Sequence, residues 1–135
     1  MTGKIKKKVL VLGSRGQVGS ALCVYLKDKY EVYGVDIVNE KSQDLRIPNN
    51  KKIKKLIKKS DFVFFLAYDV GGSRYMKKHQ NSYSFIMNNT LIMQNTFELL
   101  RINNKKFIFA TSQMSNMLFS SYGILKKIGE NFTAS

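Results

Sequence analysis

The stretch KKVLVLGSRGQVGSALCVYL, residues 7–26, decides the fold. Its first part is a short apolar run, over 7–14, that predicts a buried β-strand. Glycines follow at positions 13, 16 and 19, and an amphipathic helix is expected over 17–29. The order strand, glycine turn, helix is typical of the opening unit of an α/β protein.

The glycine turn favours a phosphate-binding role. Glycine allows a tight turn, the approach of a diphosphate without a Cβ in the way, and close packing of helix on strand. The phosphates would then meet free N–H groups at the helix N-terminus. The residues expected to bind a dinucleotide here are Gly13, Gly16, Gln17, Val18 and Gly19.

Asp36 ends the second expected strand, about twenty residues after the turn. A carboxylate in that place can accept hydrogen bonds from both hydroxyls of an adenosine ribose, and it would repel a 2′-phosphate. NAD rather than NADP is therefore the expected cofactor. The alternative is that the glycines only make a tight turn and that Asp36 only starts a loop.

The rest of the chain repeats the alternation of strand and helix. Further strands are expected over 30–36, 61–68 and 105–112, and further helices over 48–60, opened by Pro48, over 83–102 and over 120–133. Such an order predicts a parallel sheet covered on both faces, a doubly wound α/β fold. The 135 residues are expected to form a single domain.

Composition excludes several classes of protein. The formal net charge is +14, but it comes mostly from lysine, and the four arginines are scattered, so no specific nucleic-acid partner is expected. A lone cysteine, Cys23, fits a cytoplasmic location. The apolar part of the N-terminal segment is too short for a signal peptide, and no apolar segment is long enough for a membrane span. No metal site is predicted.

The motifs GSRGQVG, QDLR, DFVFFLAY, ATS and YGILK, with Asp36, occur in an order that resembles the extended short-chain dehydrogenase/reductase family. Its members are NAD-dependent nucleotide-sugar epimerases, dehydratases and reductases. The resemblance implies a Rossmann-like fold. It also implies that Asp44 and Leu45 lie by the adenine and that Leu66 and Ala67 pass under the cofactor.

The same resemblance assigns catalytic roles near the end of the chain. Tyr122 and Lys126 match the family's Y-x-x-x-K, Ser112 matches its catalytic Ser/Thr, and Asn89 falls where the family has a helix asparagine. Tyr122 would be the acid/base of hydride transfer at a sugar carbon. Lys126 would lower the pKa of that phenol and bind the nicotinamide ribose, and Ser112 would orient the substrate.

Two stretches, LAYDVGG and MNNTLIMQNTFELLRINN, are most similar to GDP-mannose epimerase and GDP-fucose synthase. A nucleotide sugar, GDP-linked on this likeness, is the expected substrate. Family members commonly pair through two helices, which are here near 83–102 and 119–134, so a homodimer is expected.

The chain departs from the family in two ways. The interval between Ser112 and Tyr122 is short, and the sequence stops just after the tyrosine helix. The expected fold is thus a truncated Rossmann-like domain without the C-terminal substrate domain, with little activity by itself. The alternative function is a non-enzymatic NAD-binding regulatory or scaffold module derived from the family.

Overall fold

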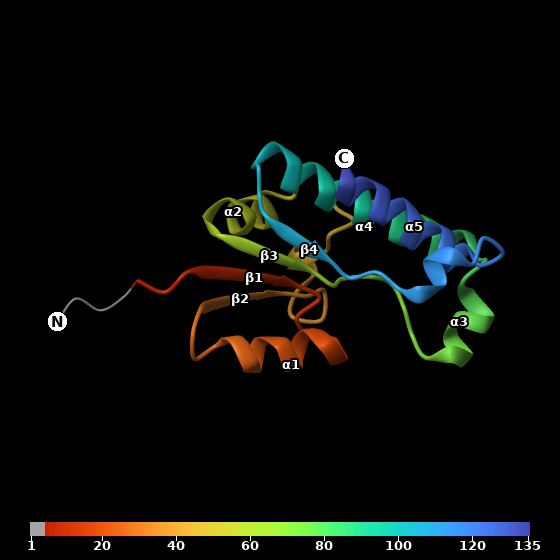
Figure 1. Ribbon diagram of the computed structural model, residues 1–135, viewed down its shortest axis with the longest axis horizontal. Helices are drawn as coiled ribbons and strands as arrows, with labels where there is room; N and C mark the ends of the chain where they lie inside the picture. The colour runs from red at the N-terminus through yellow and green to blue at the C-terminus, as the bar shows by residue number, and fades with distance from the viewer. Residues whose placement is uncertain (1–4) are drawn as a thin grey trace.

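A computed structural model describes residues 5–135 and shows one parallel sheet of four strands (Figure 1). The strand order is β2-β1-β3-β4. The strands are β1 (Lys8–Leu12), β2 (Glu31–Val35), β3 (Phe62–Phe65) and β4 (Phe107–Phe109). Leu12, the last residue of β1, pairs with Val35 on one side and Phe65 on the other, so three strands end at one level.

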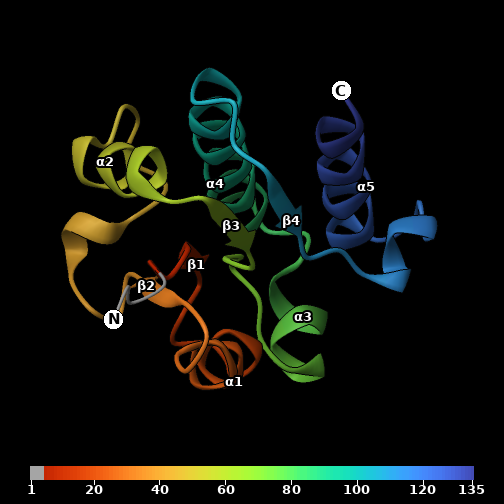
Figure 2. The ribbon, with the colours of Figure 1, turned by 60° about the vertical axis from the view of Figure 1, so that its left-hand side comes forward.

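Helices cover both faces of the sheet. They are α1 (Gln17–Leu26), α2 (Lys51–Lys59), α3 (Ser73–His79), α4 (Tyr83–Ile102) and α5 (Ser121–Ala134), with short 3-10 helices η1 (Lys41–Gln43) and η2 (Gln113–Asn116). Figure 2 shows α1 on one face and α2, α4 and α5 on the other. The doubly wound α/β fold predicted from the sequence is therefore confirmed.

Strand β1 lies at the centre of the molecule and is buried on both of its faces. Leu10 and Leu12 belong to the larger core, which α2, α4 and α5 cover. Val9 and Val11 point the other way and pack with Leu26 of α1. Because side chains alternate along a strand, a strand buried on both faces must be apolar throughout, and this is the pattern of residues 9–12.

Several element boundaries differ from the prediction. Helix α2 begins at Lys51 rather than at Pro48, because the side chain of Asn50 accepts hydrogen bonds from the N–H groups of Lys52 and Ile53 and caps the helix. Pro48 lies in the preceding turn. Helix α1 ends at Leu26 and all four strands are shorter than expected.

Helix α3 was not predicted. It has seven residues, none of them buried, so the sequence carries no apolar periodicity there. None of the helices formed by residues 5–135 combines the length and the apolarity that a membrane span requires.

Candidate dinucleotide-binding site

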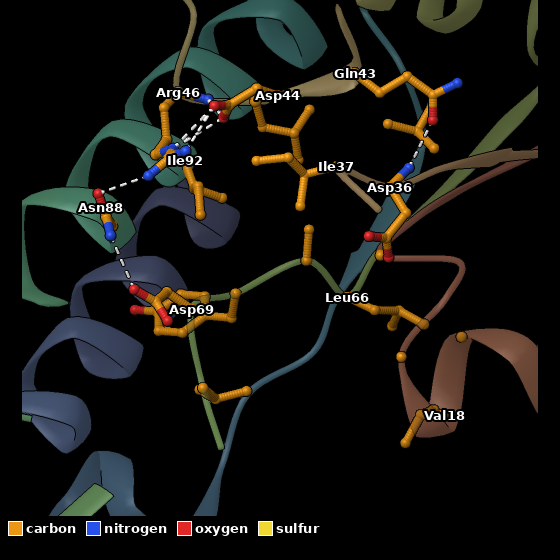
Figure 3. Close-up of a pocket in the computed structure, with 18 of the residues that line it drawn as sticks. Val18, Asp36, Ile37, Gln43, Asp44, Arg46, Leu66, Asp69, Asn88 and Ile92 are labelled. Carbon is orange, nitrogen blue, oxygen red and sulfur yellow. Dashed lines mark hydrogen bonds and ion pairs between the residues drawn. The ribbon is translucent and has the colours of Figure 1, made fainter. Parts of the chain in front are cut away.

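A pocket of about 810 Å³ opens at the carboxyl ends of β1, β2 and β3 (Figure 3). Its walls come from the turn before α1, the loop after β2, the loop after β3 and one side of α4. The volume lies in the range of pockets that hold small ligands. Ligands of open α/β sheets bind at this edge, outside the carboxyl ends of the strands.

The glycine turn forms one end of the pocket, and two of its glycines are required by close backbone contacts. Gly13 has a φ of +90°, and a Cβ there would lie 2.8 Å from the nitrogen of Ala67. A Cβ on Gly19 would lie 2.0 Å from the carbonyl oxygen of Gly13. At Gly16 the nearest atom would be 3.5 Å away, so this glycine is not needed for packing. It leaves the pocket open in front of α1.

The N-terminus of α1 offers free hydrogen-bond donors to the pocket. Within residues 5–135, the N–H groups of Gln17, Val18 and Gly19 have no acceptor. The first turn also contains no acidic residue. Unpaired N–H groups and the positive end of the helix dipole together favour an anion. This part of the pocket therefore fits a diphosphate.

Asp36 lies next to the glycine turn because the N–H of Gly13 donates to the carbonyl oxygen of Val35 at 2.8 Å. One carboxylate oxygen of Asp36 accepts from the N–H of Arg15 at 2.9 Å, and the other accepts from the N–H of Val38 at 3.0 Å. These bonds fix the carboxylate at the pocket wall. Each oxygen keeps a further lone pair, which is what two ribose hydroxyls require.

The other residues predicted to bind the cofactor also line this pocket, with the exception of Lys126. Asp44 is held by an ion pair with Arg46 at 2.7 Å, and the hydrogen bonds from Arg46 keep the pKa of Asp44 below its usual value. The backbone carbonyl of Leu45 accepts from the Asn95 side chain at 3.0 Å. The predicted residues that line the pocket are Gly13, Gly16, Gln17, Val18, Gly19, Asp36, Asp44, Leu45, Leu66 and Ala67.

Ser112, Tyr122 and Lys126 do not line the pocket but lie beside it. The link is Tyr68, a pocket residue whose ring centroid lies 5.9 Å from that of Tyr122. The Lys126 ammonium nitrogen lies 3.7 Å from the centre of the Tyr68 ring and donates to the carbonyl oxygen of Ala110 at 2.7 Å. The structure thus brings the three residues together next to the end of the pocket that Tyr68 forms.

The electrostatics of this group differ from the sequence-based expectation. Burial raises the pKa of Tyr122, and a hydrogen-bonding interaction with Ser112 only partly opposes that shift. Lys126 is turned toward Ala110 and Tyr68, and its nitrogen is 5.8 Å from the Tyr122 ring centre. The pKa of Tyr122 is thus raised rather than lowered in this arrangement, and burial lowers the pKa of Lys126 to about 8.

Asn89 fixes the loop that follows β3. Its side-chain oxygen accepts from the N–H of Asp69 at 2.6 Å, and its amide nitrogen donates to the carbonyl oxygens of Asp69 and Phe85 at 3.0 and 3.1 Å. The amide is fully buried, so these bonds replace water. Asn89 therefore acts on the pocket through the backbone of Asp69.

The sequence analysis did not single out several pocket residues, among them Arg46, Tyr68 and Asn88. Tyr68 could have been found, because it directly follows the apolar strand that leads into the pocket. Arg46 and Asn88 carry no such signal. They come from segments 42 residues apart and meet only because α4 passes the loop after β2.

The chain is similar to known enzymes in sequence pattern and in fold. Residues 9–123 match the model of the NAD dependent epimerase/dehydratase family. A comparison with curated proteins finds no match.

Three solved structures illustrate the likeness in fold. GDP-L-fucose synthetase from Naegleria fowleri has a TM-score of 0.70 and 18% identity, and the match covers 97% of this chain and 44% of that one. dTDP-4-dehydrorhamnose reductase from Bacillus anthracis, in complex with NADP, has a TM-score of 0.76 and 17% identity, and the match covers 98% of this chain and 51% of that one. ADP-L-glycero-D-manno-heptose-6-epimerase from Helicobacter pylori has a TM-score of 0.72 and 18% identity, and the match covers 99% of this chain and 53% of that one.

The chain thus spans about half the length of these structures, and at such identities the likeness shows the fold alone. The family model is the stronger finding, since it matches most of the chain from β1 to the start of α5. The chain belongs to the NAD dependent epimerase/dehydratase family.

Proposed function

We propose that the chain is the cofactor-binding part of an NAD-dependent nucleotide-sugar epimerase, dehydratase or reductase. One observation carries the proposal. Three N–H groups of α1 that have no acceptor within residues 5–135 face the same pocket as the fixed Asp36 carboxylate, and Gly16 leaves the space between them open. A diphosphate and the ribose attached to it need this pair of features.

The proposed cofactor is NAD rather than NADP. Asp36 supports this choice, because a carboxylate that accepts two ribose hydroxyls leaves no room for a 2′-phosphate and repels its charge. The B. anthracis reductase is similar in fold and was solved with NADP. In this chain the backbone N–H of Arg15 donates to Asp36, so the Arg15 side chain is a cation that could meet such a phosphate. Calorimetric titration with both dinucleotides tests the choice, and tighter binding of NADP would overturn it.

Bound NAD would supply the hydride acceptor at a sugar carbon. In this proposal Tyr122 takes the proton from the sugar hydroxyl, Ser112 holds that hydroxyl, and Lys126 binds the nicotinamide ribose. Tyr122 needs a lower pKa for this task than burial gives it here. Only a short movement of the Lys126 ammonium toward the Tyr122 hydroxyl would be required to lower that pKa, since Lys126 and Tyr122 both already contact Tyr68.

The proposed substrate is a nucleotide sugar, and a GDP-linked one is the first choice. The support is the pair of stretches around residues 66–72 and 87–104, together with the fold of the N. fowleri GDP-L-fucose synthetase. Little turnover is expected from these 135 residues alone, since the match covers 44% of that enzyme.

A second candidate is a non-enzymatic NAD-binding module of regulatory or scaffold type. The observation that favours it is the position of Ser112, Tyr122 and Lys126 outside the pocket lining, with Lys126 bonded to the Ala110 carbonyl. Such a module would bind NAD in the pocket and would not need Tyr122 as an acid/base.

The variant Tyr122→Phe separates the two candidates. An enzyme should lose about a hundredfold or more in the rate of NADH formation with a GDP-sugar, while its affinity for NAD stays within about twofold. Tyr25→Phe, on an exposed position of α1, is the matched control. NAD binding without any NADH formation, in the unaltered chain and in Tyr122→Phe alike, favours the module. Calorimetry that detects no NAD binding to the unaltered chain would overturn both candidates.

The proposed assembly is a homodimer through α4 and α5. The two helices lie side by side on one face of the sheet (Figure 2), and each exposes apolar side chains. These include Ile86 and Met87 on α4 and Ile124 and Ile128 on α5. Ile124→Glu should convert the dimer to a monomer in light scattering after size exclusion. A monomeric unaltered chain at tens of micromolar would overturn this part.

A further inference from the structure

Helix α2 presents one face that consists of lysines. Its sequence, KKIKKLIKK over Lys51–Lys59, holds six lysines and no acidic residue. Ile53 and Ile57 are fully buried and turn one side of the helix toward the core. The opposite side carries four exposed lysines at the spacing i, i+3, i+4 and i+7, which places them on one face. These residues, called the lysine face below, are Lys51, Lys54, Lys55 and Lys58.

The lysine face is not neutralised by the described part of the chain. The two other lysines of α2 have partners, since Lys52 forms an ion pair with Glu40 and the Lys59 ammonium lies 3.5 Å from the centre of the Tyr33 ring. The four lysines of the face make no ion pair within residues 5–135. Like charges three and four residues apart on a helix repel each other. A bound polyanion would relieve this repulsion.

Helix α2 is fixed at both of its ends. The Asn50 side chain accepts from the N–H groups of Lys52 and Ile53 at 3.1 and 3.2 Å. At the other end the Lys105 ammonium donates to the carbonyl oxygens of Lys58 and Ser60 at 2.9 and 2.6 Å. These bonds satisfy groups that a helix end leaves unpaired. A ligand of the lysine face would therefore meet an ordered helix and would not have to order it.

The lysine face is accessible and separate from the dinucleotide pocket. Figures 1 and 2 both show α2 at the outside of the molecule. None of its residues belongs to the lining of the pocket. A macromolecule could thus contact the lysine face while the pocket stays open.

The chemistry of the lysine face favours a nucleic acid duplex over a membrane. Lysines about 5–6 Å apart suit a regular row of phosphates, and a major groove about 12 Å wide admits a helix. A helix that binds a membrane surface inserts apolar side chains, but the isoleucines of α2 are buried in the core. Helix α2 has no arginine or aromatic residue to contact bases.

We infer that the lysine face of α2 binds the phosphate backbone of duplex nucleic acid independently of base sequence. Each ammonium contacts a phosphate and releases a condensed counterion. Four such contacts correspond to a slope of about −3.6 in a plot of the logarithm of the binding constant against the logarithm of the salt concentration. The interaction uses no residue of the pocket and goes beyond the proposed function.

The test is fluorescence anisotropy with a labelled DNA duplex of mixed sequence. Between about 50 and 200 mM KCl the affinity of the unaltered chain should fall by ~100-fold. Replacing the four lysines of the face by glutamine, which has a good helix propensity, should weaken binding at least ~10-fold at the lower salt concentration. The slope should become shallower by about 3. Lys54→Gln alone should make it shallower by about 0.9, so the test does not depend on the fourfold variant folding.

A matched control removes the same net charge from other exposed positions. This second fourfold glutamine variant should bind the duplex within about threefold of the unaltered chain. Arginine at the four positions of the lysine face should also preserve binding, because it keeps the charges. The lysines replaced in the control lie at the end of α1 and on α3 and are Lys27, Lys29, Lys77 and Lys78.

Three results would overturn the inference. Equal losses in the two fourfold variants would show that net charge alone attracts the duplex. An unaltered chain that fails to bind the duplex at about 50 mM KCl would exclude the interaction. Binding to phosphatidylglycerol vesicles but not to the duplex would assign the lysine face to a membrane. Normal NAD binding by a chain that does not bind the duplex would leave the proposed function standing.

Discussion

The ammonium group of Lys126 lies 3.7 Å from the centre of the Tyr68 ring, so helix α5 contacts a residue of the pocket wall. Lys126 is only 4% exposed, and its one hydrogen bond within the described chain is to the carbonyl oxygen of Ala110. The positive charge is thus buried against an aromatic face and a carbonyl, without a carboxylate.

This burial predicts that stability increases with pH in the alkaline range. Burial lowers the pKa of Lys126 to about 8 in the folded chain from an ordinary value of 10.5, so between these pH values the unfolded chain binds one more proton than the folded chain. Stability should therefore rise with pH by up to ~1.4 kcal/mol per unit from about pH 8. Lys126→Met should lack the rise. Urea unfolding of both chains at pH 7 to 9.5 measures the difference, and parallel curves would contradict the prediction.

The three glycines of the turn should respond differently to alanine. Gly13→Ala and Gly19→Ala should each destabilise the fold by ~1–3 kcal/mol or more, because a Cβ would press on backbone atoms at 2.8 and 2.0 Å. Gly16→Ala should leave the unfolding free energy nearly unchanged but weaken NAD binding, because its Cβ would enter the pocket. Urea unfolding and calorimetry give the two readouts. A Gly16→Ala chain that binds NAD normally would contradict the proposed place of the diphosphate.

Asn89→Leu should destabilise the fold although the two side chains have similar volumes. Asn89→Leu would leave the N–H and carbonyl of Asp69 unpaired against an apolar side chain, which should cost ~1–3 kcal/mol per buried group. Asn131→Leu, at an exposed position of α5, is the control and should have little effect. Amide hydrogen exchange of residues 66–70 should increase in Asn89→Leu. Unchanged exchange there would contradict the role of Asn89 in fixing this loop.

The hydrogen bonds of the Glu130 carboxylate should make the folded chain less stable in acid. Its carboxylate accepts from the hydroxyl of Thr111 at 2.6 Å, and hydrogen bonds from Thr111, Ser115 and Lys127 lower its pKa to about 2 from an ordinary value of 4.5. The contribution should be complete above pH 4.5 and disappear as pH falls toward 2. Glu130→Gln should therefore differ from the unaltered chain at pH 6 and match it near pH 2 in urea unfolding. Thr111→Val should weaken the same pH dependence.

Much of this fold could be predicted from local sequence. The alternation of short apolar runs with longer periodic segments gave the parallel sheet and helix α4 with its bounds unchanged. The glycine spacing gave one wall of the pocket, because tight turns and close backbone contacts exclude other residues at positions 13 and 19. Boundaries were less accurate, since a side-chain cap at Asn50 rather than the proline decides where α2 begins.

The sequence by itself determined the layers of the sheet and the turn that faces the pocket, because both depend on periodicity and on backbone geometry within a few residues. Only the tertiary structure decided the rest of the site. It placed Arg46 against Asn88, 42 residues away, and it turned Lys126 toward Tyr68 and the Ala110 carbonyl. The direction of a buried charge depends on which partners other elements bring within hydrogen-bonding distance, and no local pattern encodes that.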